Sequence, residues 1–159
     1  MSEIDRLRAQ LAASLDWREA HAGFDKAVEN LAPALRGKKP QGSPHSAWQL
    51  LEHMRLAQKD ILAFCVNPKY EEVLKWPDDY WPKDPAPPSE RAWDESIAEF
   101  REDREAMKKL ATDPAVELSS KIPHGTGQTY LREVLLIVDH NAYHTGELVL
   151  LRRLLGAWP

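Results

Sequence analysis

Apolar residues recur at helical spacing in three long stretches of the chain. Successive apolar positions are mostly three or four residues apart, which places them on one face of a helix. They are Leu50, Met54, Ala57, Ile61 and Phe64 in the first stretch, Trp93, Ile97, Phe100, Met107 and Leu110 in the second, and Leu136, Ile137, Leu148, Leu151 and Leu155 in the third. No dipeptide typical of a β-hairpin separates alternating runs. The pattern therefore predicts amphipathic helices that share one core.

The prolines delimit these helices, because proline lacks an N–H and clashes with the preceding helical turn. The chain has 12 prolines, and they leave the windows 1–32, 45–67, 89–113 and 124–158 free. Leucine and alanine, with 20 and 19 residues, far outnumber the 16 valines, isoleucines and threonines, which favours helix over strand. We predict one all-α domain over residues 1–159, a four-helix bundle with helices at 3–33, 46–65, 89–111 and 129–155.

Several residues are typical of helix ends. Ser46 and Gln49 have the spacing of a capping box, Ser89 and Thr129 can cap the next two helices, and Gly156 suits the position after the last helix. In the first window, Ser14 and Asp16 could each cap a second segment, so that helix is expected to break near Leu15.

Residues 66–88, here called the crossover, form the longest connection. Long structureless loops are uncommon in compact domains, and the crossover contains four large aromatic residues, Tyr70, Trp76, Tyr80 and Trp81. We expect it to be ordered and to join two parallel helices, which gives the bundle an up-down-down-up topology. Whether it also approaches a functional site stays open at this point.

Composition narrows the functional classes. The net charge of −4 offers no basic surface for a nucleic acid. No apolar run approaches the roughly 20 residues that span a bilayer, and the charged start of the chain is not typical of a signal peptide, so we expect a cytoplasmic protein. The single cysteine, Cys65, excludes an internal disulfide and a multi-cysteine metal site.

Two histidines, His140 and His144, lie four residues apart within the last predicted helix, on the face that carries Ile137 and Leu148. Inward-facing imidazoles require polar partners, which a divalent metal or backbone carbonyl groups can provide. His53 borders the apolar face of the second predicted helix. Three neutral imidazoles with an open fourth position are typical of a catalytic zinc site.

The segments HSAWQLLEHMRLAQKDIL and TYLREVLLIVDHNAYHTGELVLLRRLLG, separated by a long insertion, resemble the DinB-like superfamily of bacterial four-helix-bundle proteins. The resemblance covers nearly the whole chain. It implies that His53, His140 and His144 bind one divalent metal ion, commonly zinc or nickel. Many relatives have Arg-Gly-Gln after the last ligand, where this chain has Thr145-Gly146-Glu147.

Three further residues are candidates for a catalytic role. Glu147 and Asp139 flank the histidine pair, and either carboxylate could accept a hydrogen bond from a ligating imidazole or act as a general base. His124 lies just before the last predicted helix and could reach the mouth of the site. We expect His45, beside the Ser46 cap, to be a solvated turn residue.

The resemblance implies a metal-dependent enzyme that acts on a small molecule. Its most specific form is a thiol-dependent S-transferase or isomerase that uses a low-molecular-weight thiol, and a hydrolase would use the same metal site. Two alternatives remain: a non-catalytic metal-binding or stress-linked bundle protein that acts through a homodimer interface, and a metal-free helical module.

Overall fold

The chain is all helical in the computed structural model, which describes residues 1–159. The helices are α1 (Glu3–Ser14), α2 (Phe24–Val28), α3 (Ala47–Val66), α4 (Glu90–Thr112) and α5 (Tyr130–Leu154), with 3-10 turns η1 (Pro33–Leu35) and η2 (Asp78–Tyr80). There is no strand, and one isolated bridge joins Lys121 to Thr129. The all-α prediction is confirmed. None of the helices has the length and apolar character that crossing a membrane requires.

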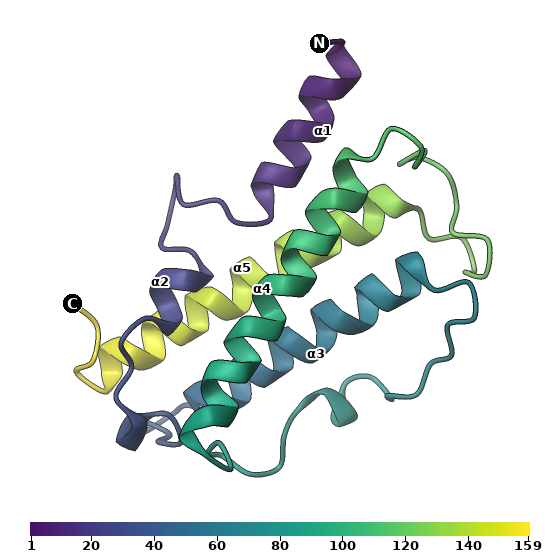
Figure 1. Ribbon diagram of the computed structural model, residues 1–159. Coiled ribbons are helices and arrows are strands. Elements are labelled where there is room, and N and C mark those ends of the chain that lie inside the picture. Colours follow the sequence, from purple (N-terminus) through teal and green to yellow (C-terminus); the bar gives the residue numbers. More distant parts are fainter.

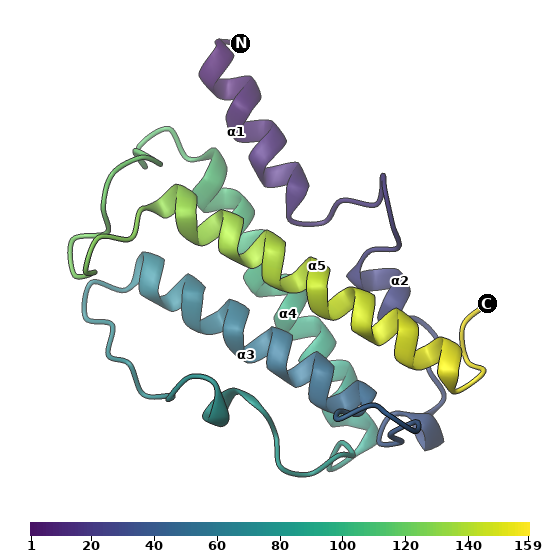
Figure 2. The same cartoon turned by 180° about the vertical axis from the view of Figure 1, so that it is seen from behind.

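Three long helices form the body of the bundle (Figure 1). α3 and α4 run in the same direction, and α5 packs against α3 in the opposite direction (Figure 2). α1 runs opposite to α4, packs against one end of it and projects beyond the body. This arrangement is the predicted up-down-down-up order.

The predicted caps begin and end these helices. The Ser46 hydroxyl accepts a hydrogen bond from the Gln49 amide, and the Gln49 side chain accepts one from the Ser46 amide, which completes the capping box of α3. Ser89 and Thr129 accept equivalent bonds at α4 and α5. Gly156 follows α5 with a φ of 68°, the left-handed conformation that favours glycine at this position.

The first predicted helix, 3–33, breaks near Leu15, as expected, but its second part is much shorter than predicted and begins later. α1 ends at Ser14, residues 15–23 form no helix, and α2 begins after Gly23 rather than after Ser14 or Asp16. Residues 16–22 are polar or small apart from Trp17, so they offer no apolar stripe to bury as a helix. The break allows α2 to turn back and pack on α5. The absence of proline permits a long helix in residues 1–32, but a helix there also needs an apolar face to bury, and residues 16–22 lack one.

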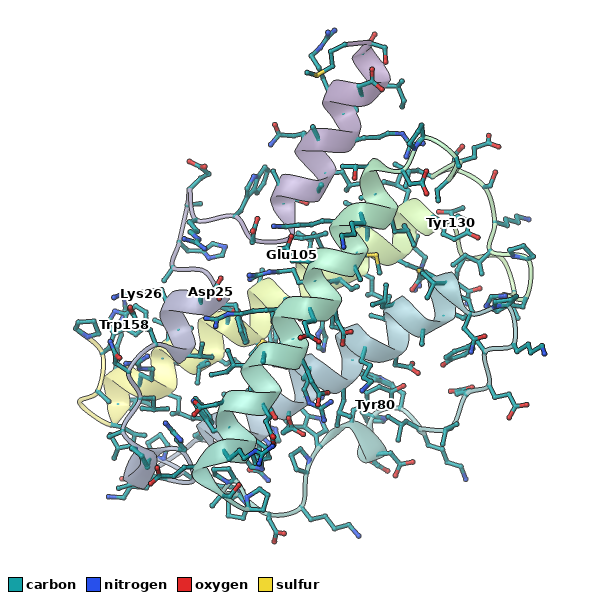
Figure 3. The ribbon with its side chains drawn as sticks, in the orientation of Figure 1. Asp25, Lys26, Tyr80, Glu105, Tyr130 and Trp158 are labelled. Atoms are coloured by element: carbon teal, nitrogen blue, oxygen red, sulfur yellow. The ribbon has the colours of Figure 1, made fainter.

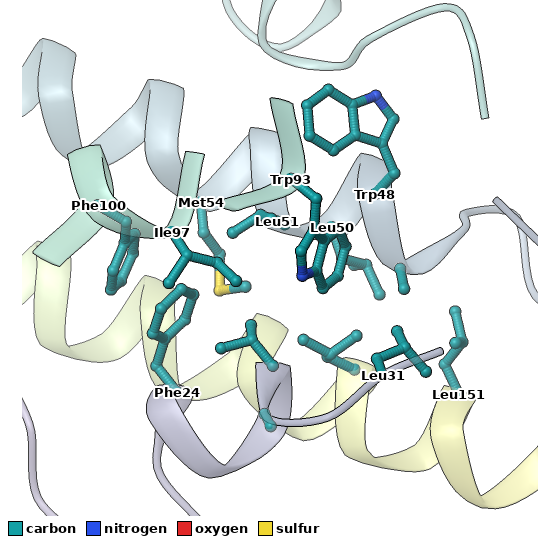
Figure 4. Packing of buried hydrophobic residues seen from close by; sticks show 14 residues of the cluster. Phe24, Leu31, Trp48, Leu50, Leu51, Met54, Trp93, Ile97, Phe100 and Leu151 are labelled. Carbon is teal, nitrogen blue, oxygen red and sulfur yellow. The ribbon is translucent and has the colours of Figure 1, made fainter. Parts of the chain in front are cut away.

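The main core lies where α2 reaches the long helices (Figure 4). The ring of Phe24 in α2 stacks on that of Phe100 in α4, with centroids 3.8 Å apart. Trp93, Ile97 and Leu50 pack into the same cluster. These α3 and α4 residues belong to the apolar stripes that the sequence predicts. Burial of this surface stabilises the bundle at about 25 cal/mol per Å² of apolar area.

The crossover follows α3 along its outer side (Figure 2). At the start of α3 the Ser46 hydroxyl bonds to the carbonyl oxygen of Pro85, and the Gln49 side chain donates to that of Pro82 at 2.8 Å. Further along, the Asp60 carboxylate accepts the Tyr80 hydroxyl at 2.7 Å. The crossover is therefore ordered, as predicted, and is attached to the helix that carries His53.

Candidate metal centre

The three predicted histidines meet between α3 and α5. His53 lies in the first half of α3, and His140 and His144 lie one turn apart on the facing side of α5. One ring nitrogen from each lies within 4.8 Å of the others, and the Nε2 atoms of His53 and His140 are 3.0 Å apart. His53 is 1% exposed and His144 is 8% exposed. The cluster therefore has the composition and spacing of a site that could hold a metal ion.

The crossover holds the imidazole of His53 in two ways. The Nδ1 atom of His53 is 3.1 Å from the carbonyl oxygen of Tyr80, so we assign the ring proton to Nδ1, which donates to that oxygen. The indole of Trp81 stacks on the ring of His53, with centroids 3.7 Å apart and planes 5° from parallel. The Nε2 lone pair of His53 is therefore unprotonated and faces His140.

Glu147 plays the corresponding part for His144. Its Oε2 atom is 2.6 Å from Nδ1 of His144, one helical turn away on α5. A carboxylate can only accept in such a pair, so the ring proton of a neutral His144 lies on Nδ1 and its Nε2 lone pair is free. Of the two roles considered for Glu147, the structure shows the contact that the first one requires, the acceptance of a hydrogen bond from a ligating imidazole.

Burial keeps His53 and His140 neutral. It lowers the pKa of His53 to about 3, and the nearby His140 and His144 add to this shift against the raising effect of the Tyr80 carbonyl. Burial also lowers the pKa of His140 to about 4, with a further contribution from His144. Metal ligation requires the unprotonated form of an imidazole, so both rings are in the required state at neutral pH.

The donor set fits a divalent metal ion. The assigned tautomers of His53 and His144 leave two nitrogen lone pairs directed into a buried space with His140 beside them. Ligand nitrogens of a tetrahedral zinc site lie about 3.3 Å apart when the bonds are about 2.0–2.1 Å, close to the spacing between His53 and His140. Three imidazoles suit zinc, nickel, copper and iron. Such an ion would give each lone pair a partner.

Aromatic rings of the crossover form one wall of the cluster. Trp76 lies 5.6 Å from His53 and 6.1 Å from His140 between ring centroids, and Trp81 adds an edge contact to His144. Trp76 is 60% exposed, whereas Tyr80 is buried. The crossover therefore does more than bridge two parallel helices, because it borders the candidate site.

His45 is also part of this wall, which corrects the expectation of a solvated turn residue. Its ring stacks on Trp81 with centroids 3.8 Å apart. Two parallel rings this close to one indole do not fit on the same face, so Trp81 lies between His45 and His53. Burial lowers the pKa of His45. A cavity of about 240 Å³ beside the cluster is lined by His45, Glu147 and four leucines, Leu50, Leu150, Leu151 and Leu154.

The other predicted residues occupy different places. Asp139 is exposed and affects the cluster only through its charge, which raises the pKa of His140 slightly against burial. His124 lies at the far end of α3, where its Nε2 is 2.8 Å from the carbonyl oxygen of Phe64. Eleven residues separate Phe64 from His53, about 16 Å along the helix. The structure therefore does not bring His124 to the three-histidine cluster.

Sequence reasoning missed His45 and the specific contact of Tyr80. His45 precedes α3 and Tyr80 ends the short 3-10 turn η2, so the spacing of the long helices carried no information about them. The high aromatic content of the crossover was the available signal, and it indicated burial without a location. Gln49 was recognised as a capping residue, but its second bond, to Pro82, was not.

Comparison with known proteins agrees with the geometry. Residues 16–148 match a protein family described as the DinB superfamily, a span that includes all three histidines. Searches of curated proteins and of solved structures give no match. Because the match covers most of the chain, this protein belongs to the DinB superfamily.

Proposed function

We propose that this protein is a metal-dependent enzyme whose three histidines hold one zinc or nickel ion and leave a position open to a small-molecule substrate. The observation that carries the proposal is the convergence of three imidazoles, two of which have their Nδ1 atoms engaged by acceptors. A metal ion would give the three imidazoles one common partner, whereas without it the Nε2 atoms of His53 and His140 have only each other, 3.0 Å apart.

A bound divalent ion would supply Lewis acidity to a thiol, a carbonyl group or a water molecule. The chain supplies the remaining features. His53, His140 and His144 hold the ion, while Tyr80 and Glu147 orient two of the rings. Glu147 also lines the cavity beside the cluster, which supports a second proposed role for its carboxylate as the acceptor of a proton from a substrate that enters there.

The proposed reaction class is a thiol-dependent S-transfer or isomerisation, which rests on the family resemblance. The chain cannot provide the thiol itself. Cys65, its one cysteine, is buried near the end of α3, and burial raises the pKa of its thiol to about 12. A thiolate is the reactive form, so a thiol-dependent reaction here requires a low-molecular-weight thiol from solution. Hydrolysis of an ester or amide is the second candidate reaction at the same centre.

The first measurement is the metal content of protein purified without chelator or nickel resin. We expect close to one equivalent of zinc or nickel, lost in His53→Ala and retained in His124→Gln, which removes a histidine outside the cluster. Less than about a tenth of an equivalent in the parent protein, even after addition of either metal, would overturn the metal site.

The second measurement is turnover of the metal-loaded protein on a panel of thiol–electrophile conjugations and ester or amide hydrolyses. We expect turnover that depends on the metal and is absent in His53→Ala. A protein that holds its metal but turns over no member of the panel is a metal-binding bundle protein, the non-catalytic alternative, and the enzymatic proposal is then wrong.

A further inference from the structure

Tyr80 is attached to α3 at both of its ends. Its carbonyl oxygen accepts from Nδ1 of His53 at 3.1 Å, and its hydroxyl donates to Oδ2 of Asp60 at 2.7 Å. His53 and Asp60 are seven residues apart, which is two helical turns and places them on one face of α3. Tyr80 therefore spans the distance between them, and its side chain lies beside α3 (Figure 3).

The Tyr80 carbonyl has a specific consequence for His53. A histidine that donates from Nδ1 presents an unprotonated Nε2, which is the nitrogen that faces His140. Tyr80 is 5% exposed, so no bulk water competes at this position. If Tyr80 moved, His53 could take the other tautomer, in which Nε2 carries the proton and cannot bind a metal ion.

The Asp60 carboxylate keeps Tyr80 in place. Trp81, the next residue, stacks on the ring of His53, so the position of Tyr80 also sets the position of that indole. Besides the bonds of Tyr80 to His53 and Asp60, a direct bond from α3 to this part of the crossover joins Gln49 to Pro82. Asp60 therefore holds the crossover to α3 on the C-terminal side of His53, and Gln49 holds it on the N-terminal side.

We propose that Asp60 is a positioning residue for the metal site, which holds the Tyr80 carbonyl against Nδ1 of His53 and thereby keeps Nε2 of His53 free to bind metal. This inference rests on the proposed function of the three histidines as ligands. It assigns a role in that site to a carboxylate that does not touch the histidines.

Tyr70 provides a matched control. Its hydroxyl donates to the same carboxylate, 3.0 and 3.1 Å from the two Asp60 oxygen atoms. Its ring, however, packs against Phe64 and His124, away from the cluster. Tyr70→Phe therefore removes the same kind of bond from the same acceptor without touching the connection to His53.

The test compares Tyr80→Phe, Asp60→Ala and Tyr70→Phe in the full chain. Zinc affinity is measured by competition with a chromophoric chelator, and the thermal midpoint of metal-free protein is recorded beside it. We expect zinc to bind about 10-fold more weakly to Tyr80→Phe and to Asp60→Ala, and within about 2-fold of the parent to Tyr70→Phe. The double variant Asp60→Ala/Tyr80→Phe should bind zinc no more weakly than the weaker-binding single variant, because both changes interrupt the same connection between Asp60 and Tyr80.

A second readout separates positioning from general loosening. In metal-free protein, the ring ¹⁵N chemical shifts of His53 should report the Nδ1–H tautomer in the parent and in Tyr70→Phe, and a mixture of tautomers in Tyr80→Phe and Asp60→Ala. Parent-like zinc affinity and tautomer in Tyr80→Phe would overturn the inference, as would an equal loss in Tyr70→Phe. If the parent binds no zinc, the proposed function fails, while the tautomer measurement still decides the role of Asp60.

Discussion

At the residue scale, the candidate site depends on what each imidazole does with its second nitrogen. His144 uses Nδ1 to donate to the Glu147 carboxylate, and His53 uses Nδ1 to donate to a backbone carbonyl. A carboxylate acceptor increases the basicity of a ligating imidazole more than a neutral acceptor does, because the bond is charge-assisted. The two candidate ligands, His53 and His144, are therefore supported unequally.

This difference predicts the effect of changing Glu147. We expect Glu147→Gln, which keeps an acceptor but removes the charge, to weaken zinc binding less than Glu147→Ala, which should cost about 10-fold. Chelator competition measures both. Asp139→Asn serves as the control because Asp139 is an exposed carboxylate on the same helix. An equal loss in Asp139→Asn would mean that general negative charge, and not the contact with His144, supports the metal.

The neutral histidines also predict how the metal-free protein responds to acid. The folded-state pKa values of His53 and His140, about 3 and about 4, lie below the ordinary value of 6.5. As the pH falls from 6.5 to about 4, the unfolded chain binds protons at these positions that the folded chain does not. The free energy of unfolding should therefore fall in this window, by up to about 1.4 kcal/mol per pH unit for each ring.

Urea denaturation of chelator-treated protein between pH 7 and pH 4.5 measures this slope. His53→Gln removes one of the two titrating rings and should lessen the slope, whereas His21→Gln, a change at an exposed histidine, should leave it unchanged. A parent-like slope in His53→Gln would show that carboxylate titration elsewhere accounts for the acid sensitivity.

At the element scale, α3 organises the site. It supplies His53, and its Ser46, Gln49 and Asp60 side chains hold the crossover. The three long helices were predictable because their caps and apolar stripes are local in sequence. The path of the crossover was not predictable, since it depends on bonds between residues 20 to 39 positions apart. The same distinction explains why the pair of His140 and His144, one helical turn apart, was found from its spacing and His45 was not.

We expect Trp81, which lies in the crossover, to contribute more to substrate binding than to metal binding. This indole stacks on His53 and on His45, and it makes no coordinating contact. We expect Trp81→Ala to retain one equivalent of metal and to raise KM several-fold for any substrate found in the activity panel. Trp48→Phe, a change at a buried tryptophan of the main core, is the control for altered packing. If KM and kcat were unchanged in Trp81→Ala, this prediction would be wrong, and the role of Trp81 in the crossover would be structural only.

At the scale of the whole molecule, the candidate centre connects parts of the chain that are far apart in sequence. Its candidate ligands come from α3 and α5, and its wall comes from the crossover that precedes α4. The wrong start and length of the second part of the first predicted helix belong to this scale, because α2 is set by its fit against α5 and the ring of Phe100 and not by local propensity. Metal binding would therefore add a cross-link between α3 and α5 to their packing and to the hydrogen bond from Asn141 to Gln58.

That cross-link predicts a stability gain when metal is present. A ligand that binds only the folded state stabilises it by about 2.7 kcal/mol at a free concentration 100-fold above Kd. For a chain of 159 residues this corresponds to a rise in Tm of about 5–10 °C. Calorimetry of zinc-loaded and chelator-treated protein measures the shift, which His124→Gln should retain and His53→Ala should lose. Equal midpoints in the two states of the parent would contradict a metal ion held between α3 and α5, because such an ion must be released when those helices separate.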